Sequence, residues 1–513
     1  MEVSSFIFTF FLIFLPLLLA IVKNHKKSKK LPPGPWKLPI IGNLHQLDIS
    51  RPYITLKELS KKHGPLMHLK LGERSTIVIS SYKILKELMK TSDTILSHRP
   101  ELLVSETVAY NGRDIAFAPY GDYWKQMRKI CTSEILSTRR IHSNYPLMEE
   151  EISRLVKNIK ESSSKGTLIN VYECLNSLSC AIICRATVGT TCNDSDSLIS
   201  TIRKITPLVG LFNISDLFPS LKFLNRYITG SNQKLLKVHH ELCDRLLEEI
   251  VHEHEESIRK NNVDEEDLLH LLLRLREKES HNFQVPITRD NVKAIILDMF
   301  IGGTDTTSIL VEWAMAELLK NPNMMKKAQV EVREVLKGKK KVDHIDVQNL
   351  KYLKLIVKET LRLHPPGPLA IPRESIEEIA INGYVIPNKT IALMNLYAMG
   401  RDPEYWHDPE KFMPDRFNNY VDNDVKMIKG SSNVPMEFLA FGFGKRVCPG
   451  MLFATASSEL TLARLLYHFD WTLPNGMNPQ DLDMTEGFGA AATMKNNLYL
   501  VATPTRFSLS QFI

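Results

Sequence analysis

The sequence predicts a mainly α-helical protein with a smaller β-rich portion, preceded by one N-terminal transmembrane helix. Three observations lead to this prediction. Helical periodicity dominates beyond Tyr82, in long amphipathic stretches. Short β-branched or alternating runs gather near the start of the chain and return late. An uncharged run that is long enough to cross a bilayer precedes both.

Local patterns give the expected elements in order. From Trp36 to about Ser81 we expect short strands, because 66–71 and 76–79 alternate or are β-branched. Amphipathic helices are expected near 141–161, 233–259 and 324–336, and an apolar helix over 291–319. A second β-rich patch is expected at 380–396, where Asn382-Gly383 indicates a tight turn, and another strand at 497–502.

Bulk composition points to one large body. The chain has 513 residues, of which 43% are hydrophobic and 24% charged, as in ordinary globular proteins. No internal repeat and no long Gly/Ser linker follows residue 40, so residues 37–513 should form a single catalytic domain. The net charge of +7 is modest for this length and argues against a nucleic-acid partner.

Residues 1–22 are predicted to anchor the chain in a membrane. Phe6 to Val22 carry no charge, and extension back to Val3 gives about 30 Å of helix, the thickness of a bilayer core. Lysines are concentrated in 23–30, whereas only Glu2 lies before the run. This asymmetry predicts a luminal N-terminus and a cytosolic body.

A basic and proline-rich hinge is predicted at 23–36. Its Leu31-Pro32-Pro33-Gly34-Pro35 segment is stiff and cannot continue a helix. The alternative for the N-terminus is a cleaved secretory signal. Such a signal needs a basic n-region and a small-x-small cleavage site, and neither is clear here.

The seven cysteines make a poor disulfide framework, because their number is odd and they are scattered. This favours a reducing, cytosol-facing compartment. Cys180 and Cys184 share a helix face at i, i+4, so a metal pair is conceivable. No second Cys or His pair with zinc-like spacing joins them, and core packing is the favoured interpretation.

The most informative segment is Phe441 to Gly450, in which Cys448 lies in a glycine-rich loop with Arg446 two residues before it. Glycines allow a sharp turn and close approach to a flat group. We expect backbone amides to point at the sulfur and to favour the thiolate. A thiolate is the haem ligand that promotes cleavage of the O–O bond.

This segment resembles the haem-binding signature of the cytochrome P-450 superfamily at Phe441, Gly444, Arg446, Cys448 and Gly450. The resemblance covers essentially the whole chain and is strongest to plant microsomal members of the clan numbered seventy-one. It implies the fold of that superfamily and haem b (iron protoporphyrin IX), with Cys448 as the axial iron ligand.

The expected 291–319 helix contains the locally unfavourable segment Gly302-Gly303-Thr304-Asp305-Thr306. It resembles the oxygen-binding groove of the family. The resemblance implies that Gly303 leaves space for oxygen, that Asp305 relays protons and that Thr306 supplies a stabilising hydroxyl.

The resemblance also implies a scaffold and haem contacts. Glu359 and Arg362, one helical turn apart, should form a buried triad with Arg416, a network whose loss of one partner costs about 3–5 kcal/mol. The positions that match propionate contacts of the family are Trp124, Arg128, Arg373 and Arg446.

Substrate contacts are expected from alignment with the family at Ile301, Ala370, Ile371 and Phe488. The segments 115–119 and 207–218 should line the same pocket. These segments are apolar or small, which favours a bulky hydrophobic substrate.

The implied function is an NADPH- and O₂-dependent monooxygenase of the endoplasmic reticulum membrane. NADPH-cytochrome P-450 reductase, a flavoprotein, would supply electrons, and cytochrome b5 is a further possible partner. The chain is similar to oxidases of terpenoids and monoterpenoid indole alkaloids. Desaturation or ring coupling would use the same chemistry. The alternatives are a haem-thiolate isomerase or dehydratase that works without reductase, and a non-enzymatic haem binder.

Overall fold

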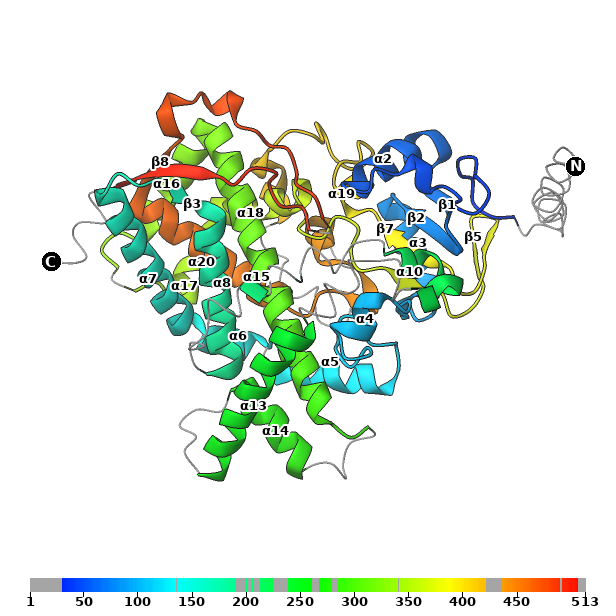
Figure 1. Ribbon diagram of the computed structural model, residues 1–513. Coiled ribbons are helices and arrows are strands. Elements are labelled where there is room, and N and C mark those ends of the chain that lie inside the picture. The colour runs from blue at the N-terminus through cyan, green and yellow to red at the C-terminus, as the bar shows by residue number, and fades with distance from the viewer. Residues whose placement is uncertain are drawn as a thin grey trace, which may run out of the picture.

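The structure is a computed structural model of the chain. It describes residues 30–134, 136–189, 200–201, 205, 213–224, 239–260, 267–278, 285–339, 341–420, 436–489 and 491–505. The body is helical over most of its extent, with a smaller β-rich part next to the N-terminal end of the described chain (Figure 1). The prediction of a mainly α fold with a smaller β-rich portion is therefore confirmed.

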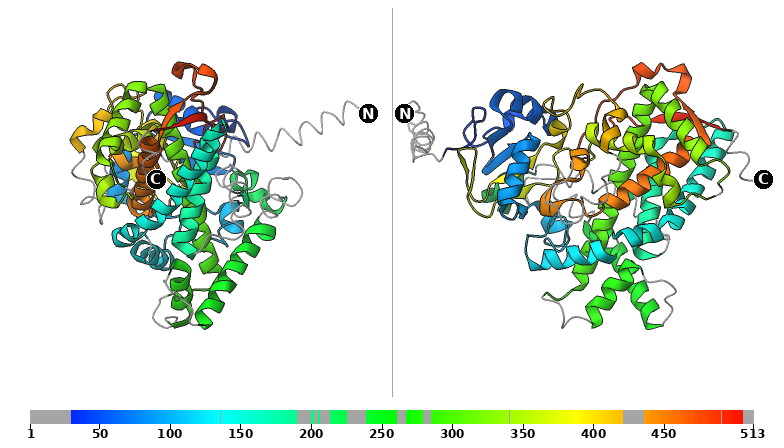
Figure 2. Two further views of the ribbon diagram at one scale, coloured as in Figure 1. Left: turned by 90° about the vertical axis from the view of Figure 1, so that its left-hand side faces the viewer. Right: turned by 180° about the vertical axis from the view of Figure 1, so that it is seen from behind.

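The longest helix, α15 (Arg289–Lys320), runs through the centre of the body (Figures 1 and 2). Its N-cap Thr288 accepts a hydrogen bond from the Asn291 amide and forms a capping box with that residue. The helices α8 (Val171–Val188), α18 (Lys351–Leu363) and α20 (Met451–His468) pack against it. All three present buried apolar residues to α15, which explains why residues 307–319 of this helix are buried throughout.

Shorter helices surround this centre. They are α2 (Pro52–His63), α3 (Tyr82–Ser92), α4 (Leu103–Thr107), α5 (Asp122–Glu134), α6 (Thr138–Ser143), α7 (Tyr145–Ser164), α10 (Ile214–Leu217), α13 (Asp244–Arg259), α14 (Leu268–Lys278), α16 (Pro322–Val335), α17 (His344–Gln348) and α19 (Leu396–Met399).

The strands of the described residues form three small sheets. The largest has the order β1 (Leu66–Leu71), β2 (Arg74–Ile79), β7 (Ile391–Met394) and β4 (Arg373–Glu374). A second has the order β3 (Ile169–Asn170), β9 (Tyr499–Pro504) and β8 (Phe469–Thr472), and β5 (Ile379–Ile381) pairs with β6 (Tyr384–Ile386). The parallel β2–β7 pairing, with Thr76 opposite Ile391, brings an early and a late part of the chain together.

Most elements lie where the sequence predicts them. The expected 291–319 helix is α15, the strand runs 66–71 and 76–79 belong to β1 and β2, and Asn382 and Gly383 form a left-handed turn with φ of 50° and 74°. Residues 233–238 lie outside the described part. One expectation is wrong: 36–81 is not strands throughout, because α2 begins at Pro52. Proline at the first helical position favours that helix start.

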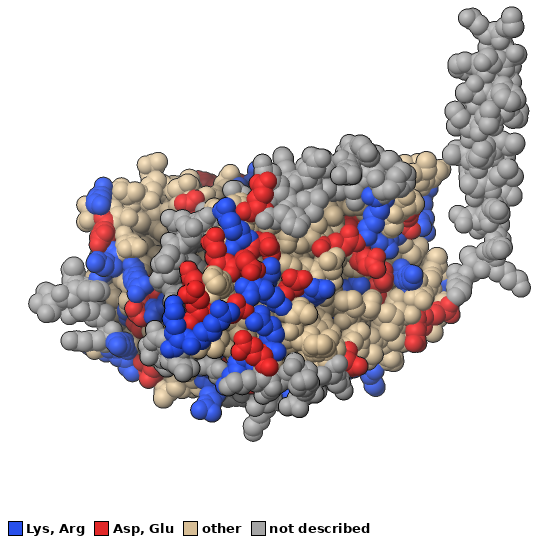
Figure 3. Space-filling model, turned by 60° about the horizontal axis from the view of Figure 1, so that its bottom comes forward, with Lys and Arg blue, Asp and Glu red and all other residues tan. Residues whose placement is uncertain are grey.

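The predicted anchor at 1–22 and most of the hinge lie outside the described residues. Among the described helices, α15 is long and apolar enough to cross a membrane. Two thirds of its most apolar window is buried inside the protein, as is usual for a core helix. Basic and acidic side chains are interspersed on the face shown in Figure 3.

Candidate active site

The loop that carries Cys448 precedes α20 and is shaped by two glycines. Gly442 and Gly444 have φ of 82° and 63°, a region that side chains with a Cβ disfavour. The Cys448 amide donates a hydrogen bond to the Phe441 carbonyl at 2.8 Å. A Cβ added at Gly450 would lie 3.9 Å from Cys448 Sγ. The loop therefore closes on itself, and Cys448 is half-buried in it.

Asp93, at the end of α3, fixes this loop from outside. Its carboxylate accepts a hydrogen bond from the Lys445 amide at 3.0 Å and lies 3.4 Å from Arg373 Nη1. It also occupies the space that a Cβ of residue 444 would need, so Gly444 is required here for space as well as for φ. Sequence reasoning missed Asp93, because an aspartate at a helix end gives no local signal of such a contact.

An amide points at the Cys448 sulfur, as expected, but its effect on the pKa of the thiol is outweighed. Burial raises the pKa of its thiol, whereas a hydrogen bond from the Gly450 amide and the nearby Arg128 guanidinium lower it. Burial prevails, so the loop by itself does not favour the thiolate. A bound metal cation would favour the thiolate, because a thiol that coordinates a metal is deprotonated.

Four arginines gather beside the loop: Arg99, Arg128, Arg373 and Arg446. All four donate hydrogen bonds to main-chain carbonyls. Arg128 Nη2 donates to Val447 at 2.5 Å, and Arg373 Nη2 donates to Phe443.

Arg446 makes three of these bonds. It donates to the carbonyls of Ser97, Ile115 and Ala118, at 2.8, 3.3 and 2.6 Å. Its guanidinium carbon lies 4.3 Å from the ring centroid of Trp124, whose indole N–H also donates to the Ile115 carbonyl. All four predicted propionate contacts, Trp124, Arg128, Arg373 and Arg446, are therefore in contact with one another or with the Cys448 loop.

Arg99 belongs to the same group and was not predicted. It donates to the carbonyls of Ala116, Ile371 and Pro372 at 2.7–2.8 Å, and it is 7% exposed. Its signal in the sequence is weak, a charged residue before proline in a short extended segment. The tertiary structure places it near Arg446, and burial together with the Arg446 guanidinium lowers the pKa of Arg99.

These arginines form a buried excess of positive charge. Burial, together with Arg373 and Arg128, lowers the pKa of Arg446 to about 9, and burial lowers the pKa of Arg373 to about 10. The nearby described carboxylates are Asp93 and Asp114. A ligand with two further carboxylates would neutralise the excess. The arginines beside a cysteine loop therefore fit the propionates and the iron of haem b.

The two adjacent glycines of α15, Gly302 and Gly303, have different surroundings. A Cβ at Gly303 would lie 2.5 Å from Cδ1 of Ile183 on α8, so this glycine permits close helix packing. A Cβ at Gly302 would meet nothing within 4 Å. The open space beside α15 thus lies at Gly302, which corrects the expectation for Gly303.

Asp305 and Thr306 point in different directions. The Thr306 hydroxyl donates to the Gly302 carbonyl at 2.6 Å, on the open side of α15. Asp305 is buried and accepts hydrogen bonds from Asn176 at 2.6 Å and from Tyr172 at 3.2 Å, both on α8. The structure therefore places the two side chains on the same helix turn without joining them.

The scaffold triad is present. Glu359 pairs with Arg362 through two contacts of 2.8 Å and with Arg416 Nε at 3.0 Å. The Glu359 side chain is fully buried, and Arg362 also donates to the carbonyls of Gly400 and Pro409. This network ties α18 to the segment that leads toward the Cys448 loop.

A family model for cytochrome P450 matches residues 32–501. The chain belongs to the cytochrome P450 family. Membership implies a haem cofactor and monooxygenase activity. The fold is similar to that of a zebrafish cytochrome P450 solved with abiraterone, with a TM-score of 0.71, 24% identity, and coverage of 89% of this chain and 100% of the other.

Plant enzymes are among the curated relatives. The chain is 47% identical to desmethyl-deoxy-podophyllotoxin synthase of Sinopodophyllum hexandrum, over 98% of both chains. It is 46% identical to premnaspirodiene oxygenase of Hyoscyamus muticus, over 96% of this chain and 97% of the relative. Identity to costunolide synthase of Cichorium intybus is 46%, over 93% of both. The recognition as a plant cytochrome P450 is thereby confirmed.

In this cytochrome P450 a mainly apolar cavity of about 100 Å³, whose lining also includes Arg74 and Asp216, lies between the largest sheet and the segment before β4. Ala370 lines it, as do Leu217 and Gly489. Of the other predicted substrate residues, Ile301 and Ile371 are partly buried and do not line this cavity. Residues 207–212 lie outside the described part.

Phe488 differs from the expectation. Its side chain is 56% exposed, and the neighbouring Gly489 lines the cavity instead. The backbone turn at 487–489 directs the ring outward, which the apolar composition of this segment does not reveal.

Cys180 and Cys184 are buried, with their sulfur atoms 4.0 Å apart on α8. They belong to the apolar core, and no other ligand-type group of the described residues clusters with them. The interpretation as core packing is preferred over a metal pair.

Proposed function

We propose that this cytochrome P450 is an NADPH- and O₂-dependent monooxygenase that oxidises a hydrophobic plant terpenoid. The observation that carries the proposal is the Cys448 loop beside the buried arginines. Relatives named premnaspirodiene oxygenase and costunolide synthase support the substrate class. Monoterpenoid indole alkaloids are the second class to be screened.

The residues present would hold haem b. Cys448 would be the axial ligand of the iron, and Arg99, Arg128, Arg373 and Arg446 would bind the two propionates, with Trp124 packed against two of the guanidinium groups. When bound, haem would supply the activation of O₂: with two electrons from NADPH and two protons, one oxygen atom enters the substrate and the other leaves as water.

The residues of α15 would handle protons on the open side of the helix. Thr306 Oγ1 keeps its lone pairs free for a further hydrogen bond, because its proton is donated to Gly302. Asp305 would relay protons from solvent, and its carboxylate must turn away from Asn176 to reach Thr306. Asp305 and Thr306 are therefore proposed as catalytic residues.

The lining of the cavity favours a hydrophobic substrate. Its lining includes Pro52, Leu71, Leu369 and Leu393. The segment from Ala370 to Pro372 joins it to Arg99 through the Ile371 and Pro372 carbonyls. A hydrophobic molecule in this cavity would lie against the segment that also contacts the proposed haem site.

Electrons would come from NADPH through a flavoprotein reductase. Cytochrome b5 would bind at the same basic face as the reductase. Three lysines are exposed here, Lys125 and Lys129 on α5 and Lys445 in the Cys448 loop. The ammonium groups of Lys125 and Lys445 lie 5.4 and 6.0 Å from the same Tyr120 ring, so the two form one basic face. With the predicted anchor, this arrangement suits an enzyme on the cytosolic side of the endoplasmic reticulum membrane.

A reduced carbon monoxide difference spectrum tests the site. We expect a Soret band far to the red in the wild type and its loss in Cys448→Ser. An unshifted band in well-folded wild type would overturn Cys448 as ligand. NADPH oxidation with reductase and a terpenoid panel then tests the activity: product formed without NADPH would indicate an isomerase or dehydratase, and no product with any substrate class would indicate a haem binder.

A further inference from the structure

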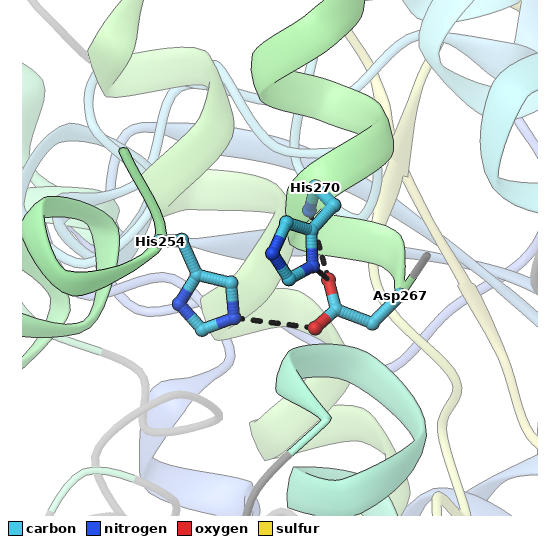
Figure 4. Close-up of side chains that lie close together, drawn as sticks. All are labelled: His254, Asp267 and His270. Atoms are coloured by element: carbon cyan, nitrogen blue, oxygen red, sulfur yellow. Dashed lines mark hydrogen bonds and ion pairs between the residues drawn. The ribbon is translucent and has the colours of Figure 1, made fainter. Parts of the chain in front are cut away.

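We propose that His254, Asp267 and His270 form a binding site for a divalent transition-metal ion of the zinc class, separate from the haem site. His254 lies on α13, Asp267 immediately precedes α14, and His270 lies on the first turn of α14. One ligand atom from each of the three side chains lies within 4.8 Å of the others. Figure 4 shows both imidazole rings beside the one carboxylate.

The position of His254 requires a cation next to its Nε2 atom. Its Nδ1 lies 2.8 Å from the Ile250 carbonyl, which can only accept, so Nδ1 carries a proton. Its Nε2 lies 3.1 Å from the Val188 carbonyl and 3.2 Å from Asp267 Oδ2. A neutral ring would direct a lone pair at two oxygen atoms. Either a second proton or a metal ion must therefore lie at Nε2.

His270 distinguishes between these two possibilities. Both of its ring nitrogens are buried and have no hydrogen-bond partner among the described residues. Nδ1 lies 2.9 Å from Asp267 Oδ1, without the alignment of a hydrogen bond. A second proton on His254 would give a hydrogen-bond partner to His254 Nε2 and to Asp267, but none to the ring nitrogens of His270. A metal ion would also use a nitrogen of His270, whose burial otherwise costs free energy.

The surroundings have features of a metal site. The Nδ1–H of His254 is held by a main-chain carbonyl, the contact that fixes the tautomer of metal-binding histidines. Tetrahedral zinc with ligand bonds of about 2.0–2.2 Å places its ligand atoms roughly 3.4 Å apart, close to the separation of His254 Nε2 and Asp267 Oδ2. Gly189 follows α8, and a Cβ there would lie 2.8 Å from Asp267 Oδ2. The chain thus keeps space beside the carboxylate.

An ion at this site would clamp three elements together: the end of α8, the second half of α13 and the start of α14. In Figure 1 α13 and α14 form the end of the molecule that lies away from the sheets. None of the proposed haem-binding residues belongs to these two helices. The expected effect of the ion is therefore greater stability of the helix pair, with an unchanged haem spectrum.

The test uses the full-length holoprotein without a polyhistidine tag. The protein is treated with EDTA, exchanged into metal-free buffer, and titrated with zinc chloride by calorimetry. We expect one saturable site per chain and a higher unfolding temperature. His254→Gln and His270→Gln should each weaken binding by at least about 10- to 100-fold. His252→Gln is the matched control, because this histidine lies on the same helix, is 62% exposed and should not affect the site.

His270→Gln keeps the test falsifiable if the His254 variant fails to fold, because the His270 ring makes no hydrogen bond that folding would lose. A normal carbon monoxide spectrum confirms the fold of each variant. Absence of saturable binding to the wild type would overturn the proposal. Equal affinity in all four proteins would do so too, since binding would then be adventitious. If zinc has no effect while His254→Gln alters the pH dependence of unfolding, the cation is a proton.

Discussion

The Asp298 carboxylate on α15 accepts a hydrogen bond from the backbone amide of Ile115 at 2.7 Å. The next amide, that of Ala116, donates to the same oxygen at 3.2 Å. The carbonyls of these two residues accept from Arg446 and Arg99. One short segment is thus held by a carboxylate on its amide side and by arginines on its carbonyl side, between α15 and the proposed haem site.

Asp298 also lies against Asp114, and this pair predicts a pH dependence. Burial raises the pKa of Asp114 to about 6 from its ordinary 3.8, and burial together with Asp114 raises the pKa of Asp298. Between the ordinary pKa of 3.8 and the raised pKa of about 6, Asp114 keeps its proton in the folded protein but has released it in the unfolded chain. The pair therefore contributes stability below about pH 4 that is lost as the pH rises through about 6.

Asp298→Asn should remove much of this loss of folding stability at higher pH. The amide oxygen of the asparagine can still accept the hydrogen bond from the Ile115 amide. We expect the variant to gain stability relative to wild type between pH 5 and pH 8, by about 1–3 kcal/mol in urea unfolding. Asp290→Asn, an exposed position on the same helix, is the control. A difference that does not change with pH would contradict the shared proton.

Glu359→Ala should abolish haem incorporation. The change leaves Arg362 and Arg416 buried without their partner, at a cost of about 3–5 kcal/mol. The haem content per protein and the urea midpoint measure the effect. Glu58→Ala, which breaks the exposed Glu58–Lys61 pair of α2, should cost less than about 1 kcal/mol. A normally folded Glu359→Ala holoprotein would refute the structural role.

The two glycines of α15 should respond differently to alanine. Gly303→Ala should destabilise by about 1–3 kcal/mol, because the new methyl group meets Ile183. The double variant with Ile183→Val, which removes Cδ1, should recover part of that loss. Gly302→Ala should leave stability unchanged or raise it by up to about 1 kcal/mol, but lower the coupling of NADPH oxidation to product. Equal effects on stability at both positions would contradict the assigned packing.

Arg99→Gln should accelerate haem loss by about tenfold or more, because a charged donor is removed from the proposed propionate site. The measurement is transfer of haem to apomyoglobin. Arg113→Gln is the control, since Arg113 is about half exposed and pairs with Asp290. Identical haem-loss rates for the two variants would exclude Arg99 from the site.

Lys125→Gln with Lys129→Gln should slow reduction by the flavoprotein at low salt, by about tenfold, and should flatten its dependence on ionic strength. Lys61→Gln with Lys62→Gln, an equal change of charge on α2, should have little effect. Stopped-flow reduction over a range of salt concentrations distinguishes them. If salt leaves the wild-type rate unchanged, the basic face does not steer the reductase.

Sequence patterns located the elements whose signal is local. α15 is long and apolar enough to be recognised by length alone, β1 and β2 alternate, and Asn382-Gly383 adopts the left-handed turn typical of that pair. α2 was missed, because it directly precedes strand-like runs and its apolar face is weakly patterned. Phe488 was misplaced, because apolar composition does not fix the direction in which a turn presents its side chain.

By itself the sequence determined the family, the position of Cys448 in its glycine-rich loop and the helix of Glu359 and Arg362, because fixed spacings along the chain specify them. Only the tertiary structure decided that Arg99 joins Arg446, that Asp93 braces the loop, that Gly302 and not Gly303 faces open space, and that two histidines meet Asp267. Each of these depends on contact between segments far apart in the chain, where no local pattern constrains the partner.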